Sequence, residues 1–127
     1  MSAENMQNLA VWMDIPVVDL DRSIQFYKEV IGREISKESF GDLDFAVFMH
    51  ESGNGACLVP DETLVSEDRG ILVYFNVDGR IRDAVEMAKQ NGGKVIEDTH
   101  AIGPHGFRAL LVDSEGNRIA VHSNTDS

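Results

Sequence analysis

Two side chains capable of acid–base chemistry lie in segments of alternating polarity. Asp14 belongs to residues 9–18 and His122 to residues 118–123, near the other end of the chain. Apolar residues at every second position predict strands with one face on a core. Asp14 and His122 then face the open side, where a carboxylate beside an imidazole would raise the pKa of that imidazole and form an acid–base pair. A purely structural hydrogen bond, or two solvated side chains, is the alternative.

The same alternation assigns further residues to this open side. Apolar and aromatic groups with a few polar ones are typical of small-molecule sites. We therefore expect the open side to bind a ligand. The candidate ligand-binding residues are Trp12, Cys57, Leu72, Tyr74, Asn76 and Ala120.

Three candidates have two readings each. Trp12 could stack on an aromatic or cationic ligand, or fill space as a buried plug. Cys57 would need a nearby base and a lowered pKa to act as a nucleophile, and a buried, inert thiol is the alternative. His105 lies in residues 99–106, a Gly- and Pro-containing loop of the kind that can cover a pocket. It either reaches a ligand from there or is simply exposed.

The elements that must position these side chains occur twice along the chain. Residues 9–18 predict a strand, Asp19 a helix N-cap and Gly32 the end of that helix. Asp78 sits where the cap of a second helix belongs, and residues 91–93 end that helix. The remaining predicted strands are residues 33–40, 44–50, 56–59, 71–77, 94–98, 107–112 and 118–123.

These landmarks recur in the same order and at a nearly constant offset, which indicates a duplicated βαβββ unit. The first unit spans residues 9–60, the second spans residues 71–123, and the polar residues 60–70 link them. One such unit cannot bury its sheet alone. The prediction is a single α+β domain over residues 1–127, in which the paired repeats form a curved mixed sheet around a cleft.

The motifs at both ends resemble those of the vicinal oxygen chelate superfamily, which includes glyoxalase I, bleomycin-resistance proteins and extradiol dioxygenases. Residues 15–27 read Ile-Pro-Val-Val-Asp-Leu-Asp-Arg-Ser-Ile-Gln-Phe-Tyr, similar to its Val-x-Asp-Leu opening and Ser-x-x-Phe-Tyr helix. Residues 113–120 read Asp-Ser-Glu-Gly-Asn-Arg-Ile-Ala, similar to its Asp-Pro-Asp-Gly-Asn-x-x-Glu ending. The resemblance covers residues 9–123 and implies a glyoxalase-like fold, but one fold hosts many activities.

The resemblance also implies four metal-ligand positions, usually His and Glu, on the first and last strand of each repeat. The matching residues here are Trp12, Cys57, Leu72 and Ala120. Three of them cannot bind a metal, and a lone thiol is not a site. A register shift of one residue gives only Met13, Leu58, Val73 and Val121. We therefore expect neither metal nor cofactor; relocated ligands such as His50, His105 and His122 are the alternative.

The amino-acid composition limits the kinds of binding partner and the cellular compartment that we expect. The chain has 127 residues, with 22 acids against 11 bases, a net charge of −11 and a pI near 4.6. This balance argues against binding to nucleic acid or to an anionic membrane. Its single cysteine excludes an internal disulfide and favours a reducing compartment, and no signal or membrane segment is evident. We expect a cytoplasmic protein.

The leading function is a glyoxalase-like protein that binds a small molecule in a metal-free cleft. It acts as a lyase or isomerase through Asp14 and His122, or as a non-catalytic binder. One alternative is sequestration of a cationic or aromatic compound, as in bleomycin-resistance proteins, which the acidic charge and Trp12 would suit. Another is a metal-dependent lyase or dioxygenase with relocated ligands. The resemblance implies a homodimer, and completion of the cleft within one chain or across the dimer stays open.

Overall fold

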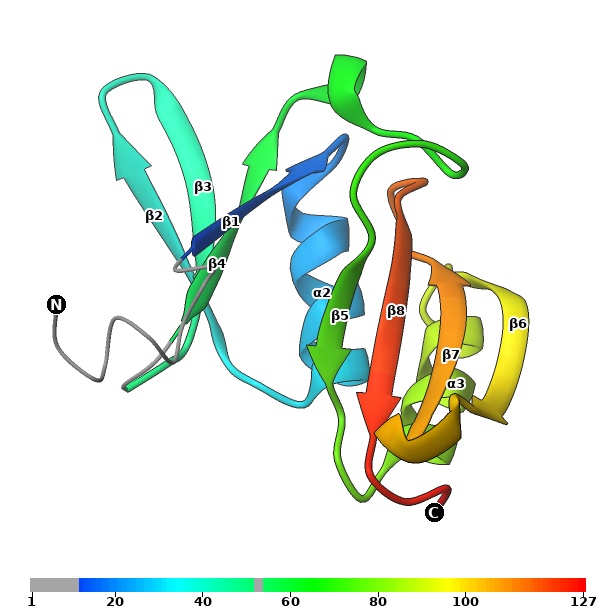
Figure 1. The fold of residues 1–127 in the computed structure, drawn as a ribbon. Helices are drawn as coiled ribbons and strands as arrows, with labels where there is room; N and C mark the ends of the chain where they lie inside the picture. Colours follow the sequence, from blue (N-terminus) through cyan, green and yellow to red (C-terminus); the bar gives the residue numbers. More distant parts are fainter. Residues whose placement is uncertain (1–11, 52–53) are drawn as a thin grey trace, which may run out of the picture.

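Two units with the same order of elements make up the described chain (Figure 1). The computed structural model describes residues 12–51 and 54–127. The first unit consists of β1 (Trp12–Val17), α2 (Leu20–Ile31), β2 (Ile35–Phe40), β3 (Leu43–Phe48) and β4 (Gly55–Pro60). The second consists of β5 (Val73–Asn76), α3 (Ile81–Gln90), β6 (Lys94–Ala101), β7 (Phe107–Val112) and β8 (Arg118–Ser123). Two short 3₁₀ helices, η1 (Glu62–Leu64) and η2 (Gly103–His105), lie in the connections.

Each unit forms its own mixed sheet of four strands. The strand orders are β1-β4-β3-β2 and β5-β8-β7-β6. The pairs β1/β4 and β5/β8 are parallel, and the other neighbours are antiparallel. The predicted α+β fold of paired βαβββ repeats is confirmed, with the curved sheet present as two sheets of four strands.

The first helix forms where its capping residues predict it. The Asp19 carboxylate accepts a hydrogen bond from the Arg22 backbone N–H at 3.0 Å, which satisfies a donor that the first turn leaves free. Gly32 ends α2 in the left-handed region at φ 76°, and its N–H donates to the Lys28 carbonyl. Phe26, Tyr27 and Val30 on the inner face of α2 are fully buried.

The second helix departs from the prediction at its start. The N-cap of α3 is Arg80, which makes no side-chain cap bond. Asp78 is not that cap, because a turn through Gly79 separates it from the helix. Its carboxylate instead accepts hydrogen bonds from Ser123 Oγ at 3.2 Å and from the Asn124 N–H at 2.7 Å, and so holds the end of β8.

Further expectations fail in the second unit. β6 continues through Ala101, so His100 is a strand residue and not part of a loop. β5 begins only at Val73, two residues after the start of the predicted strand 71–77, and Ile71 is 92% exposed. In the first unit, residues 9–11 of the predicted first strand lie outside the described residues.

One hydrophobic core serves both sheets. The Tyr27 ring of α2 contacts Phe48 of β3 and Phe75 of β5, with ring centroids 5.5 and 5.4 Å apart. α2 also packs against α3 (Figure 1). Because the helix-side faces of both sheets turn toward this core, the opposite face of each sheet is left open by the described residues. We call these the first and second open faces.

The helices are short and amphipathic. α2 has 12 residues and α3 has 10. Within residues 12–51 and 54–127, no helix has the length and apolarity needed to cross a membrane.

Candidate functional site

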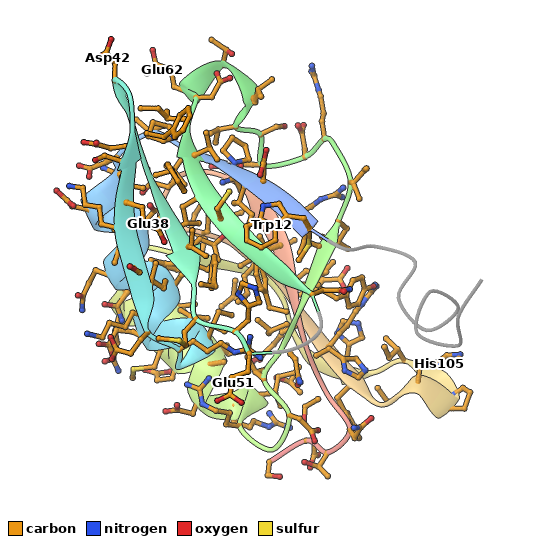
Figure 2. All side chains as sticks on the ribbon, turned by 90° about the vertical axis from the view of Figure 1, so that its left-hand side faces the viewer. Trp12, Glu38, Asp42, Glu51, Glu62 and His105 are labelled. Atoms are coloured by element: carbon orange, nitrogen blue, oxygen red, sulfur yellow. The ribbon has the colours of Figure 1, made fainter. Side chains whose placement is uncertain are left out.

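Trp12 lies on the first open face, where β1 and β4 run side by side (Figure 2). Its side chain is 43% exposed, and its ring meets the His50 ring edge-on with centroids 5.6 Å apart. His50 is half-buried against this ring. Gly55 lies beneath both, and a Cβ there would come within 2.7 Å of the indole and 2.8 Å of the imidazole. Trp12 is therefore a partly open platform, supported by His50.

Asp14 and Cys57 are neighbours on the same face. They are directly paired in the β1/β4 ladder, and Cys57 Sγ donates a hydrogen bond to Asp14 Oδ1 at 3.1 Å. Burial, and then the bond to Asp14, raise the pKa of the Cys57 thiol to about 11. A nucleophilic cysteine needs the opposite shift. The environment of Cys57 thus favours the inert-thiol reading.

Tyr74 is the most prominent aromatic residue of the second open face. It is 45% exposed, and its hydroxyl accepts a hydrogen bond from Arg108 Nη1 at 2.5 Å. Ala120 pairs with Tyr74 on one side and with Leu110 on the other, and these larger neighbours leave it fully buried. Leu72 precedes β5 and is half-buried. Of these residues Tyr74 alone offers a large accessible surface.

A row of polar residues crosses the second open face beside Tyr74. The strand registers place Asn76 opposite His122, His122 opposite Arg108, and Arg108 opposite His100. Arg108 Nε donates to His100 Nε2 at 3.2 Å. Because a guanidinium only donates, His100 Nε2 accepts, and the ring proton lies on Nδ1, which is 2.8 Å from the Asp98 carbonyl. The Glu97 carboxylate lies 3.5 Å from the same Nε2, so this acid is close to Arg108 without pairing with it.

His100 and Arg108 are not among the site residues predicted from the sequence. The signal for Arg108 is the alternation in residues 107–112. Arg108 and Leu110 alternate with the buried Ala109 and Leu111, which places Arg108 on the open face. His100 was hidden by its assignment to a loop.

His122 has a fixed orientation in the same row. Its Nε2 lies 2.7 Å from the backbone carbonyl of His105, so Nε2 carries the proton and donates it to that oxygen. In the neutral ring, Nδ1 then keeps a free lone pair. His105 itself lies in η2 with an exposed side chain, at the edge of the molecule in Figure 2 and away from Trp12. Its observed contribution is this carbonyl.

Asp14 and His122 are not brought together within one chain. They lie on different sheets, and the partner of each is another group: Cys57 Sγ for Asp14 and the His105 carbonyl for His122. Their acid–base pairing remains a prediction that requires a second copy of the chain.

A pocket of about 270 Å³ lies where the first unit meets β5. Tyr74 and Asn76 contribute to it from the second unit. The Asn76 amide oxygen accepts a hydrogen bond from the Asp78 N–H at 2.9 Å. The lining residues are Met13, Ile31, Arg33, Phe48, Asn54, Gly55, Ala56, Tyr74, Phe75 and Asn76.

Sequence comparison decides the family. A model of the Glyoxalase/Bleomycin resistance protein/Dioxygenase superfamily matches residues 9–121. The chain belongs to this superfamily. A glyoxylase-like domain-containing protein of Didymella fabae is 29% identical to this glyoxalase-superfamily protein over 116 residues, covering 86% of this chain and 88% of the relative.

Solved structures share the fold of this superfamily member at low sequence identity. A hypothetical protein from S. aureus has a TM-score of 0.72 at 18% identity, covering 94% of this chain and 97% of its own. A glyoxalase/bleomycin resistance protein from Albidiferax ferrireducens T118 has a TM-score of 0.71 at 15% identity, covering 91% and 98%. At such identities the likeness is one of fold.

The metal ion implied by the superfamily resemblance finds no suitable donors at the matching positions. Trp12 supplies an indole, Leu72 and Ala120 supply aliphatic groups, and the Cys57 thiol is protonated and bonded to Asp14. Among residues 12–51 and 54–127, no three His, Cys, Asp or Glu side chains lie close enough together to hold a metal ion. The residues present in one chain do not fit the ion.

Proposed function

We propose that this glyoxalase-superfamily protein binds a small organic molecule on its open faces without the superfamily's metal ion. The observation that carries the proposal is the exposure of Trp12 and Tyr74, at 43% and 45%, on sheet faces that the described residues leave uncovered. Aromatic side chains among a few polar groups are typical of small-molecule sites. The pocket beside Tyr74 supports the same reading.

A second copy of the chain completes the cleft in this proposal. Both sheets turn their inner faces toward one shared core. Their open faces therefore do not enclose a common cleft within one chain. Charge favours pairing the first face of one copy with the second face of another: Asp14 and Glu38 lie on the first face, and Arg118 on the second. Opposite charges across an interface fix orientation. The protein would then be a homodimer with two equivalent clefts.

The chemistry that such a cleft could support is proton transfer. His122 donates through Nε2 to a carbonyl and keeps Nδ1 as a base, while Asp14 of the second copy would approach the same cleft. A base and a carboxylate on opposite sides of a substrate suit an isomerase or a lyase.

Sequestration of a cationic compound is the second candidate. Its support is that Trp12 shares the first open face with Asp14, so that an indole ring and a carboxylate could hold a cation together.

Fluorescence of Trp12 tests the leading proposal. The chain has one tryptophan, so a change in its emission reports a ligand that binds beside Trp12. We expect saturable quenching by a ligand from a panel of small aromatic acids, amides and amines, unchanged by a chelator. Binding that requires added zinc or nickel, or stoichiometric metal in the purified protein, would contradict the metal-free site and favour relocated ligands. Thermal stabilisation by the same ligand gives a second readout.

A further inference from the structure

Most of the positively charged side chains of this acidic chain pair with a carboxylate, but a few do not. Eight of its eleven Lys and Arg side chains form ion pairs with carboxylates: Arg22, Lys28, Lys37, Arg69, Arg80, Arg82, Lys89 and Lys94. Arg33, Arg108 and Arg118 pair with no described carboxylate. Because the chain has 22 acids for 11 bases, an arginine without a carboxylate partner is unexpected. The residues outside the description add one carboxylate, that of Glu4.

Two of the three unmatched arginines, Arg108 and Arg33, lie beside Tyr74. Arg108 bonds to the Tyr74 hydroxyl, and Arg33 lines the same pocket as Tyr74. Arg118 shares the outward parity of His122 on β8, donates to the Gly70 carbonyl at 3.3 Å, and has a buried Nε without a partner. Tyr74 therefore has two arginines without a described carboxylate partner as neighbours, Arg108 and Arg33.

Arg108 is held ready for an incoming group. Its Nη1 is fixed by Tyr74 and its Nε by His100, which leaves three of the five guanidinium N–H groups unassigned. A planar fork already oriented by two neighbours loses little freedom when it binds a carboxylate or phosphate in bidentate fashion. The lone pair on His122 Nδ1, in the adjacent strand, would repel an anion, but a proton there would attract it.

The neighbouring pocket offers an apolar floor next to this charge. Phe48 and Phe75, whose rings stack with centroids 6.1 Å apart, line it together with Met13 and Ile31. Arg33 stands among the same lining residues. A volume of about 270 Å³ suits a molecule of one ring and a short substituent.

We propose that the site around Tyr74 takes a small apolar or aromatic molecule that carries a carboxylate or phosphate group, with Arg108 and Arg33 as the counter-charges. This inference rests on the proposed function and names the ligand class of the same site. It opposes the cationic ligand that the net charge suggests, because a local arrangement of unmatched arginines decides the contact while the global charge acts at long range and is screened.

A matched set of probes tests the ligand class. Benzoate, phenyl phosphate, benzamide and benzylamine share a ring and differ in charge. Calorimetry or ligand-observed NMR on the full chain should give benzoate or phenyl phosphate a Kd on the order of 1 mM, as fits fragments of this size. Benzamide and benzylamine should bind at least about tenfold more weakly, since they lack the charge-assisted hydrogen bonds. A stronger response to phenyl phosphate than to benzoate identifies phosphate as the preferred group, and the reverse identifies carboxylate.

Two substitutions and one control locate the site. Arg108→Gln and Arg33→Gln should each weaken benzoate or phenyl phosphate binding by about tenfold, and benzamide binding should change little. Lys89→Gln removes one positive charge from α3, on the opposite side of the second sheet from Tyr74, where the Lys89 side chain is 53% exposed, and should leave all affinities unchanged.

The outcomes separate this inference from the proposed function. If benzamide or benzylamine binds as tightly as benzoate, the protein still has a small-molecule site but the anionic class is wrong. If Arg108→Gln weakens the homodimer and leaves anion binding intact, Arg108 serves the subunit contact and the inference fails. If none of the four probes binds at concentrations well above the expected Kd, the small-molecule site itself is refuted. Weaker anion binding in both arginine variants, with the control unaffected, supports the assignment.

Discussion

The Cys57–Asp14 contact shows how one neighbour can set the chemistry of a residue. Burial and the Asp14 carboxylate both favour the protonated thiol, whose pKa rises from 9.0 to about 11. At neutral pH the thiolate fraction then falls by about two orders of magnitude. We expect the folded protein to react with a disulfide reagent far more slowly than the denatured chain, with a rate that climbs up to about pH 11.

The dependence on Asp14 can be measured directly. Asp14→Asn removes the negative charge, lowers the pKa of Cys57, and should accelerate its reaction several-fold at pH 8. Glu38→Gln provides the control, because Glu38 lies on the same open face but on β2, two strands away from Cys57 on β4. An unchanged rate in Asp14→Asn, or an equal acceleration in Glu38→Gln, would show that the Asp14 carboxylate does not set the reactivity.

Residue-scale prediction from sequence succeeded where strand parity decides orientation. Parity placed Trp12 and Tyr74 on open faces, and both are exposed there. It could not show that His122 is engaged by the His105 carbonyl, because that contact depends on the path of η2 between two strands. Nor could it reveal that eight cations are paired and Arg108 is not, since ion pairing is a property of the folded surface.

At the scale of elements, two aspartates at equivalent repeat positions do different work. Asp19 caps α2, whereas Asp78 binds Ser123 and Asn124. Sequence alone could not separate them, because both follow a strand and precede a helix by a short interval. The extra turn at Gly79, with φ 79°, moves the start of α3 beyond the reach of Asp78.

Substitution of each aspartate distinguishes these roles. Asp19→Ala should lower the free energy of unfolding by about 1 kcal/mol and speed hydrogen exchange in the first turn of α2. Asp78→Ala should instead speed exchange at the Asn124 amide and leave the first turn of α3 unchanged. Hydrogen exchange measured by NMR resolves the two sites. Faster exchange at the start of α3 in Asp78→Ala would restore the original prediction that Asp78 is a cap.

The whole molecule depends on a contact between its two units that the repeat pattern did not predict. The closing turn of the second unit inserts Glu115 against the start of α2. The Glu115 carboxylate accepts hydrogen bonds from the backbone N–H groups of Val18 and Asp19, at 2.9 and 2.6 Å, and from Arg22 Nε at 2.8 Å. Burial would raise the pKa of Glu115, but these bonds outweigh it and the pKa is lowered. The sequence showed this turn only as a family-like ending.

Removal of Glu115 should therefore cost much more than removal of its partner. The Glu115 side chain is fully buried, and Glu115→Ala leaves two backbone donors without an acceptor, so we expect a loss of about 3 kcal/mol in the free energy of unfolding. The Arg22 side chain is 51% exposed and stays hydrated, so Arg22→Ala should cost less than about 1 kcal/mol. Urea unfolding at pH 7 measures both.

The pH dependence follows from the same carboxylate. Because the folded pKa of Glu115 lies below its value in the unfolded chain, its stabilisation is fully present above about pH 4.5 and disappears as the pH falls through the folded pKa. The stability difference between wild type and Glu115→Ala should shrink over that acidic range and stay constant from pH 6 to 8. Equal losses in Glu115→Ala and Arg22→Ala, or a difference that persists at low pH, would mean that the two units are joined by their shared apolar core and not by this buried acid.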